Sequence, residues 1–526
     1  MSLSRVDQRL KDWFTQAKQS ASDVQSSHGV AASINSDVTQ ELLKELPAVG
    51  PVTYLPELEV VLADVERTGF DYLVEHQDVH AISDAELRFD VPTPLDVDEQ
   101  SYRTTRDVVR GTTALFDGYE GKGITVAVMD TGVHAEHPCF SGRLTDQISC
   151  VDGSYSVGDV HGHGTHVAGS VAGEDIGVAS EASILDLRVF GPGGGASTSS
   201  ILKALDLCIQ RNVDIVNMSL GSTYPSRVLD GAVDSVARAG VLACVAAGNS
   251  GPYASTINSP ASAQLALAVA ANDAHGNVAS FSSRGPNPWF AWPKPDVSSF
   301  GVDVKSASHR GGHAVMSGTS MATPAVAGVL ACVLEHQSEN PDAKFIAESL
   351  IKDAAQNQGQ SFNEVGHGVI TLRNVETYLT STAGVQQLKS KKGTTTPRNF
   401  FRESVLKCTS CPTERTIHQI AHRSDDTMRI QLSCRTGRKV DEKGNPVYDD
   451  VVLENWKHRR ISDKQFIRAL RLCGGCGKRG MVPIESTKID LDKKHHDHTK
   501  VKVGCLYCNG KGIRKIPTRL LDTWTN

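Results

Sequence analysis

Short apolar runs alternate with helical patterns from Gly121 onward, and this alternation constrains the fold more than any other feature of the sequence. Fully apolar strands separated by helices are typical of a parallel sheet that helices cover on both faces. The sequence therefore predicts an α/β fold, with a buried helix at 320–337 and a closing helix at 374–382. The strand candidates are GITVAVMD, ASILDLRVF, VDIVNMSLG, VLACVAAGN and LALAVAAND, and the helix candidates between them are STSSILKALDLCIQRN and PSRVLDGAVDSVARAG.

Four polar residues stand where such a fold gathers its chemistry. Functional groups in an open parallel sheet collect at the carboxyl ends of the strands. Asp130 follows the first apolar run, Asn249 follows the fourth, and His163 and Ser320 each open an apolar helix. Asp, His and Ser in this chain order predict a nucleophilic triad.

Each member of this triad has a general physical role. A serine hydroxyl is a weak nucleophile and needs a base within hydrogen-bond reach. His163 can be that base because imidazole titrates near neutral pH. Asp130 would accept the other ring N–H and stabilise the imidazolium. Ser320 opens a helix, so its backbone N–H has no partner within the helix and can donate to an oxyanion. Pro324 is placed in the first helical turn, where its missing N–H does no harm.

Three blocks of sequence carry a family resemblance. VAVMDTGV (126–133), GHGTHVAG (162–169) and SGTSMATP (317–324) resemble the three signature blocks of subtilisin-like serine proteases, in the family's order. NMSLG, AAGNSG, SSRGP and KPDV are similar to further blocks of that family, and the resemblance covers roughly residues 110–385. It implies a serine endopeptidase in which His163 is the base and Asn249 supplies the second oxyanion donor. An inactive homologue is less favoured, because all four positions hold the expected residue types.

The resemblance also implies where a peptide substrate binds. The segment Ser219, Leu220 and Gly221 would pair with the substrate backbone by strand addition. A second segment would line one wall of the pocket for the P1 side chain, and its small residues favour a sizeable P1 group. That segment is Ala246, Ala247 and Gly248. The rest of the pocket would come from 252–260, so the P1 preference stays open.

Three histidines fall within HGHGTHVAGS, residues 161–170. Such a cluster can indicate a metal site, but the carboxylate of a zinc-protease pattern such as H-E-x-x-H is missing. We expect His163 to be the base and His166, one helical turn on, to pack beneath it. His161 is expected at the rim, before the helix.

The sequence on either side of the protease-like region predicts further domains. Residues 1–50 are polar and predict a mobile arm. Residues 51–110 predict a prodomain-like region and linker, because 51–92 occupy the position of the family's inhibitory prodomain. In 54–82 the pattern predicts an amphipathic helix, a second helical segment and a short strand at VHAI. Cleavage would then fall between about Asp90 and Gly121. The peptidase domain is predicted over 111–385, a linker over 386–397 and a basic cysteine-rich domain over 398–526.

Seven of the twelve cysteines lie in the C-terminal region, and six of these form CxxC pairs. Two such pairs can complete a tetrahedral zinc site. CLYCNGKG (505–512) fits the CxxCxGxG repeat of the DnaJ cysteine-rich region, which CGGCGKRG (473–480) approaches. The favoured zinc ligands are Cys473, Cys476, Cys505 and Cys508. A second site at Cys408 and Cys411 would need partners such as Cys434, His418 or His422, and redox thiols or a single zinc ion remain the alternatives.

The net charge of −6 combines two unlike parts. Residues 388–526 have a balance of +15, and residues 1–387 have one of −21. A basic zinc module predicts docking to an acidic protein or to nucleic acid. Aromatic residues are sparse there, so base stacking is weakly supported.

No apolar h-region opens the chain and no run approaches a membrane span, so we expect a cytoplasmic protein without a membrane partner. Together these features predict a subtilisin-like α/β serine endopeptidase with a small N-terminal α+β region and a C-terminal zinc module for regulation or targeting. The alternative is a zinc-dependent regulatory protein whose protease domain cleaves only itself or one partner. The resemblance leaves room for calcium as well, but no residues can be assigned to it.

Overall fold

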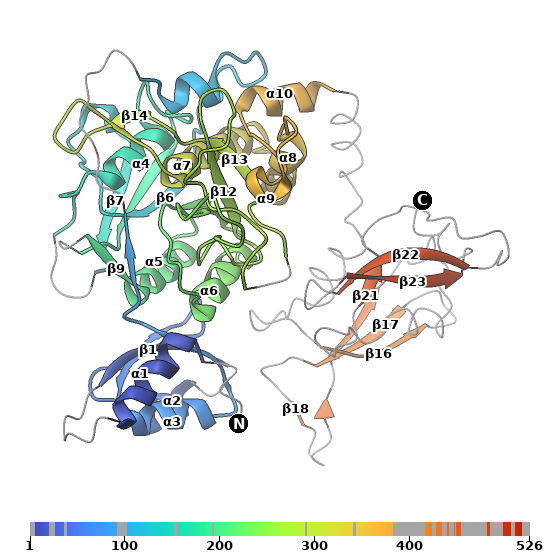
Figure 1. Cartoon of the computed structure of the whole chain (residues 1–526). Coiled ribbons are helices and arrows are strands. Elements are labelled where there is room, and N and C mark those ends of the chain that lie inside the picture. The colour runs from blue at the N-terminus through green and yellow to red at the C-terminus, as the bar shows by residue number, and fades with distance from the viewer. Residues whose placement is uncertain are drawn as a thin grey trace. The chain divides into compact units, whose positions relative to one another are not determined.

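The computed structural model describes residues 6–19, 27–35, 39–91, 102–151, 156–191, 194–289, 292–339 and 343–381, and beyond these only the strands between 416 and 517. The chain divides into two units, residues 1–385 and residues 386–526 (Figure 1). None of the helices in the described ranges is long and apolar enough to cross a membrane.

A seven-stranded parallel sheet forms the centre of the first unit, in the order β13-β12-β11-β10-β6-β8-β7. All five predicted strands are confirmed, while β7 and β13 at the two edges were not predicted. The strands are β6 (Thr125–Asp130), β7 (Leu144–Ser149), β8 (Ser183–Arg188), β10 (Ile215–Met218), β11 (Leu242–Ala246), β12 (Leu267–Asn272) and β13 (Val297–Phe300).

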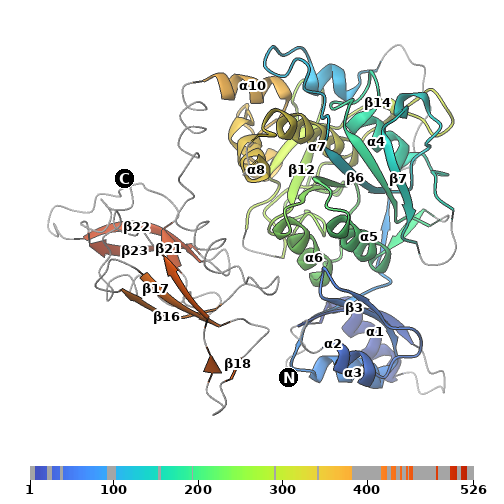
Figure 2. The ribbon, with the colours of Figure 1, turned by 180° about the vertical axis from the view of Figure 1, so that it is seen from behind.

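Helices cover both faces of this sheet, as predicted (Figures 1 and 2). Helices α4 (His163–Ala172) and α7 (Thr319–His336) pack on each other and on one face, with α7 buried from Thr319 to Leu334. Helices α5 (Thr198–Gln210) and α6 (Arg227–Arg238) cover the other face. Serine side chains cap both of these, as Ser197 Oγ accepts from Ser200 N and Ser226 Oγ from Leu229 N.

Smaller elements complete the peptidase unit. A hairpin of β14 (Val304–Ala307) and β15 (His313–Met316) contacts α4. Helix α8 (Ala343–Ala354) packs on α7, and the predicted closing helix is confirmed as α10 (Leu372–Thr380). The short helices are η3 (Arg106–Arg110), η4 (Pro138–Phe140) and α9 (Phe362–Val365).

The prediction of a mobile arm over residues 1–50 is wrong for the residues described. Strand β1 (His28–Ile34) is a central strand of a four-stranded antiparallel sheet, in the order β2-β3-β1-β4. Its residues Val30 and Ala32 are buried in a separate apolar core, which also takes in Leu10 of α1 (Gln8–Gln19) and Leu42 of α2 (Thr39–Glu45). The described residues between residue 6 and Asp84 therefore form one α+β domain.

One predicted helix in this domain is also wrong. The residues VVLADV form strand β3 (Val60–Val65), after the short strand β2 (Thr53–Leu55), because β3 finds hydrogen-bond partners in β1 and β2. The second helical segment is confirmed as α3 (Arg67–Glu75), and the strand at VHAI is confirmed as β4 (Val79–Asp84).

The predicted start of the peptidase domain at residue 111 is too late. Arg106 and Arg110 both pair with Glu120, at 3.0 and 2.9 Å, and Arg110 donates to the carbonyl of Val178 in the peptidase core. Phe116 is fully buried. The segment from Arg103 onward therefore belongs to the peptidase unit.

The second unit is described only by its strands. One sheet contains β16 (Thr416–His422), β17 (Met428–Ser433) and β20 (Asp449–Leu453), and another contains β21 (Met481–Pro483), β22 (His498–Cys505) and β23 (Lys511–Pro517). A short ladder joins β18 (Lys439–Val440) to β19 (Pro446–Val447). Cys505 ends β22, whereas Cys408, Cys411, Cys473, Cys476 and Cys508 lie outside the described residues.

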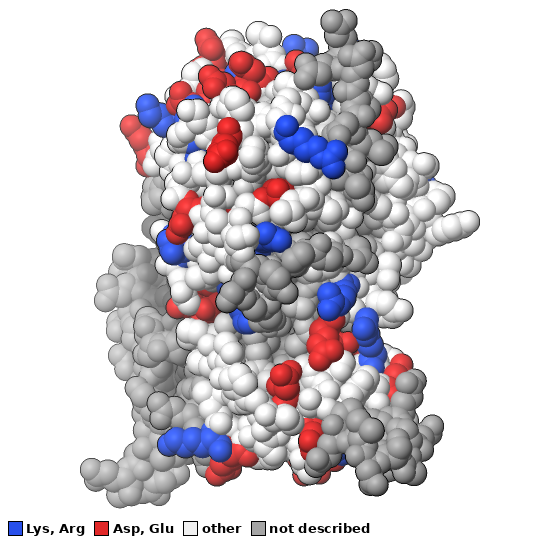
Figure 3. All heavy atoms as spheres, turned by 90° about the vertical axis from the view of Figure 1, so that its left-hand side faces the viewer, with Lys and Arg blue, Asp and Glu red and all other residues white. Residues whose placement is uncertain are grey.

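Charged side chains of both signs are interspersed on the face of the molecule drawn in Figure 3. The acidic balance of residues 1–387 is therefore not gathered into one acidic patch among the described residues of that face.

Candidate active site

Asp130 and His163 form a buried pair at the carboxyl edge of the parallel sheet. Asp130 is the last residue of β6 and His163 the first residue of α4, and both are fully buried. His163 Nδ1 donates to Asp130 Oδ1 at 2.7 Å. This bond fixes the tautomer, so Nε2 carries the lone pair. Nε2 is buried and has no hydrogen-bond partner among the described residues, so it is available to take a proton.

Asp159 holds the turn that leads into His163. Its carboxylate accepts from the backbone N–H groups of His161, Gly162 and Thr165 at 2.8–2.9 Å, and from the hydroxyls of Thr131 and Thr165. Burial alone would raise the pKa of Asp159, but these hydrogen bonds hold it below its ordinary value. The sequence analysis missed this residue, although an acidic residue just before a helix start is a capping signal.

The other two histidines of the cluster differ in burial and in their partners. His166 is fully buried and donates from Nε2 to the carbonyl of Val304 at 2.9 Å. Its burial lowers the pKa of His166 to about 3, so it stays neutral. His161 is half-buried in the turn before α4. Among the described residues no group of His, Cys, Asp and Glu is arranged to hold a metal ion.

Ser320 is the second residue of α7 and lies near the start of the helix, as predicted. Its hydroxyl donates to the carbonyl of Ser219 at 3.2 Å, and the hydrogen bond to His163 that a triad needs is not formed in this structure. Catalytic hydrogen bonds are often loose in free enzymes and tighten only with substrate bound.

Pro324 is not in the first turn of α7, contrary to the prediction, but is the sixth residue of the helix. A proline there cannot donate to the carbonyl four residues earlier, which belongs to Ser320. That carbonyl instead accepts from Ser219 Oγ at 2.7 Å. Ser219 Oγ also accepts from Asn217 Nδ2 at 3.0 Å. The Ser320 carbonyl that Pro324 leaves without a helical donor therefore links α7 to the end of β10 through Ser219.

Asn249 is oriented by Thr319, a residue that the sequence analysis did not single out. Asn249 Oδ1 accepts from both the N–H and the hydroxyl of Thr319, each at 2.9 Å. The amide nitrogen Nδ2 of Asn249 therefore points away from Thr319 and is available to donate a hydrogen bond. It lies beside Gly318, where an added Cβ would be 3.3 Å from Nδ2. The Asn249 amide and the Ser320 N–H thus both border the start of α7, as an oxyanion site requires.

Replacing Asn249 by alanine should lower kcat by about 10²–10³-fold, because one of two oxyanion donors is lost. Thr319→Val should cost less, since the amide would remain but lose one of the two bonds that orient it. Steady-state kinetics on a peptide substrate would measure both. Equal kcat in Asn249→Ala and wild type would contradict the assignment.

The two predicted substrate-binding segments leave the sheet side by side. Ser219, Leu220 and Gly221 follow β10, while Ala246 ends β11 and leads to Ala247 and Gly248. Strands β10 and β11 are parallel neighbours, with Met218 opposite Val245. Both segments therefore continue past the same edge of the sheet, toward Asn249 and Ser320.

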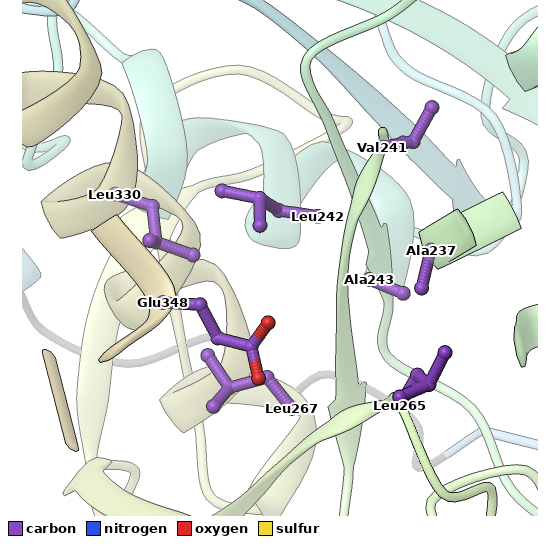
Figure 4. A pocket seen from close by; sticks show the side chains of 8 residues that line it. All are labelled: Ala237, Val241, Leu242, Ala243, Leu265, Leu267, Leu330 and Glu348. Carbon is purple, nitrogen blue, oxygen red and sulfur yellow. The ribbon is translucent and has the colours of Figure 1, made fainter. Parts of the chain in front are cut away.

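A small pocket lies elsewhere, among β11, β12, α7 and α8 (Figure 4). Apolar residues such as Leu267 and Leu330 line it, and the carboxylate of Glu348, which pairs with Lys352 at 3.0 Å, lies among them. No residue of the predicted triad lines this pocket, so it is separate from the active site.

Comparison with known proteins gives consistent matches for the first unit. Residues 121–368 match the model of the Subtilase family, a family of peptidases. The thermostable alkaline protease of Halalkalibacterium halodurans is 35% identical over 303 residues, which are 56% of this chain and 78% of that protein. Subtilisin Savinase of Lederbergia lenta is 38% identical over 259 residues, which are 48% of this chain and 90% of that protein.

A solved structure supports the fold alone. A mutant of the epidermin leader peptide processing serine protease from Staphylococcus aureus superimposes with a TM-score of 0.57 and 19% sequence identity, over 66% of this chain and 99% of that chain.

Proposed function

This chain belongs to the subtilase family and is a serine endopeptidase, and from that premise we propose that Asp130, His163 and Ser320 are its catalytic triad. The observation that carries the proposal is the fully buried 2.7 Å bond between His163 Nδ1 and Asp130 Oδ1, which leaves the opposite ring nitrogen unpaired.

The proposed reaction has two halves. Ser320 Oγ attacks the carbonyl carbon of the peptide bond while His163 Nε2 takes the hydroxyl proton. The carbonyl oxygen becomes an oxyanion held by the Ser320 N–H and the Asn249 amide. The C–N bond then breaks as His163 returns the proton to the leaving amine, which leaves an ester on Ser320. A water molecule, deprotonated by His163, hydrolyses that ester and restores the serine.

The substrate is proposed to be an extended protein or peptide segment. Support comes from residues 219–221, which directly follow strand β10 and begin next to the nucleophile, where they could pair with a substrate strand. Digestion of unfolded casein would indicate broad activity. Cleavage of the chain itself alone would favour the alternative, a protease dedicated to itself or one partner.

The N-terminal domain is proposed to act as a prodomain that inhibits the enzyme in cis. Its last strand, β5 (Arg88–Asp90), pairs antiparallel with β9 (Gly195–Ser197) of the peptidase domain, and Phe89 in β5, which lies opposite Ala196, is fully buried. The domain also attaches to α5 and α6, since Glu57 N donates to Asp206 Oδ1 at 2.9 Å and Val228 N to Ser83 Oγ at 3.1 Å. Because the chain from Arg103 onward is held in the peptidase unit, we narrow the proposed cleavage to between Asp90 and Arg103.

This docking should weaken as the pH rises through about 6, because of Asp7. Asp7 is buried where the N-terminal domain meets the start of α6, and its burial raises the pKa of Asp7 to about 6, against hydrogen bonds from Ser83 and Arg227. A carboxyl with a raised pKa stabilises the docked, folded state at acid pH, and that contribution is lost as pH rises through the raised value. Burial would raise the pKa of Asp84, but His28 and Arg9 hold this pKa below its ordinary value. Asp84 therefore stabilises the folded state at higher pH, and that contribution is lost only at pH values below those at which Asp7 titrates.

Thermal unfolding of the Ser320→Ala protein would measure this effect, since that variant should stay uncut. Between pH 5 and 7.5 it should lose roughly 1 kcal/mol more stability than Asp7→Asn in the same background. Asp12→Asn, on the exposed face of α1, is the matched control. Identical pH slopes with and without Asp7 would contradict the prediction.

The zinc module is likewise proposed, with Cys473, Cys476, Cys505 and Cys508 as ligands. The strand register supports it: Met481 opens β21 directly opposite Cys505, the last residue of β22. Cys476 lies five positions before Met481 in the sequence, and Cys508 falls between β22 and β23. Both CxxC pairs are thus close in sequence to one end of one sheet. Zinc bound there would join the segments preceding β21 and β23.

The full-length Ser320→Ala protein, kept reduced, should contain about one zinc ion or more per chain. Changing both Cys505 and Cys508 to serine should remove one, as measured by elemental mass spectrometry. Cys139→Ser, in the peptidase domain, should leave the zinc content unchanged. A folded protein without zinc, or with these pairs as disulfides, would overturn the proposal and the predicted cytoplasmic location with it.

A further inference from the structure

Asn258 lies between the two segments proposed to bind substrate. An added Cβ on Gly248 would lie 2.6 Å from Asn258 Cγ and 2.7 Å from Nδ2, and one on Gly221 would lie 3.1 Å from Asn258 Cβ. The side chain of Asn258 therefore reaches across the space between these two glycines. Gly248 also has a φ of +112°, which favours glycine, so the close approach and the backbone shape require the same residue.

Backbone hydrogen bonds join Asn258 and the next residue to the two segments. Asn258 N donates to the carbonyl of Ala247 at 3.0 Å, which joins it to one segment. Ser259 and Ser222 exchange two hydrogen bonds, each of 2.9 Å, which join the next residue to the other segment. These bonds place Asn258 between the two segments. Asn249, which directly follows Gly248, and Ser320, which is bonded to Ser219, lie beside it. The region bordered by the two segments and Asn258 is called the slot.

One atom of Asn258 indicates what the slot would bind. Asn258 is only 8% exposed, and its Oδ1 is buried without a hydrogen-bond partner among the described residues. Leaving a buried carbonyl oxygen unpaired costs free energy, so Oδ1 favours a group in the slot that donates a hydrogen bond to it. The small wall residues favoured a sizeable P1 side chain, but the Asn258 carboxamide occupies part of that room.

We propose that Asn258 is the floor of the P1 side-chain pocket and makes this protease prefer short P1 residues that carry a hydrogen-bond donor, namely serine, threonine or asparagine. The inference rests on the proposed function, because it takes Ser320 as the nucleophile. A large apolar P1 group would press against the carboxamide and leave Oδ1 unpaired, whereas a short donor side chain satisfies it. Sites built to hydrogen-bond a substrate discriminate strongly against analogues without the donor.

The test compares peptides that differ only at P1, carrying threonine, asparagine, leucine or phenylalanine, on the full-length enzyme. Wild type should cleave the threonine and asparagine peptides with kcat/KM about tenfold or more above phenylalanine. Asn258→Gly should reverse this order, because it removes the carboxamide and opens the slot. Asn258→Ala, which keeps a Cβ, should lose the preference for donors and gain less for phenylalanine. Asn277→Ala, on an exposed turn, should keep the wild-type order.

Fluorophosphonate labelling of each protein separates the two ways of failing. If wild type is not labelled at Ser320, the proposed function fails. If wild type and both Asn258 variants are labelled but share one P1 order, or if wild type prefers phenylalanine, the role of Asn258 is overturned.

Discussion

Replacing Ser320 by alanine should reduce kcat on the order of 10⁶-fold, the loss typical of a nucleophile that acts as a unit with its histidine. Ser320 lies at the start of α7, where its backbone N–H and the side chain of Asn249 border the proposed oxyanion site, whereas the hydroxyl of the preceding Thr319 is bonded to Asn249 Oδ1 at 2.9 Å. Kinetics on an unfolded protein substrate would measure the loss.

Ser317→Ala is the matched control for this variant. Ser317 lies three positions earlier, and its hydroxyl pairs with Asp303 outside the site, so its removal should leave kcat within a fewfold of wild type. The Ser320→Ala chain should also stay full length, if the N-terminal domain is removed by the enzyme itself. Residual activity near the wild-type level would show that another residue is the nucleophile.

Asp130→Asn should reduce kcat by about 10⁴-fold while the fold is retained. An asparagine can occupy the same space, but it offers an amide N–H toward His163 Nδ1 and favours the wrong tautomer. The base nitrogen Nε2 would then carry a proton and could not accept one from Ser320. Measuring kcat across pH, with near-ultraviolet circular dichroism as a check on folding, tests this expectation.

Asp186 provides a demanding control for Asp130. It is also fully buried, in β8, and its burial raises the pKa of Asp186 to about 7. Its Oδ2 accepts from Val133 N at 3.0 Å and from Gln147 Nε2 at 2.8 Å, and neither bond involves His163. Asn can still accept these bonds, so Asp186→Asn should keep activity within about tenfold of wild type. Equal losses in the two variants would mean that burial, and not the bond to His163, explains the effect of Asp130.

The fold was predictable wherever local pattern and tertiary environment agree. Strands buried on both faces are apolar throughout, and each of the five so composed was found. Strand β7, LTDQIS, is half-exposed at the sheet edge, and β13, VSSF, is short and rich in serine, so neither has that signature. In the N-terminal domain, the pattern of VVLADV predicts a helix, because its strand partner, β1, lies in a segment whose polar composition predicts an arm.

Some residues of the site can be predicted from local sequence, and others cannot. Asp130, His163, Ser320 and Asn249 stand in distinctive local blocks, so the sequence pointed to them directly. Thr319 and Asn258 act through contacts that only the folded chain creates. Thr319 orients a side chain 70 positions away, and Asn258 contacts two glycines in the segments that follow β10 and β11. Their importance comes from geometry, which no local pattern encodes.

The most direct test of the account is to find which residue carries the adduct after wild-type protein reacts with a fluorophosphonate, using tandem mass spectrometry of its peptides. The account predicts one adduct, on Ser320, that is lost in folded His163→Ala and kept in His161→Ala. An adduct on a different residue, or labelling of folded His163→Ala as strong as wild type, would contradict it.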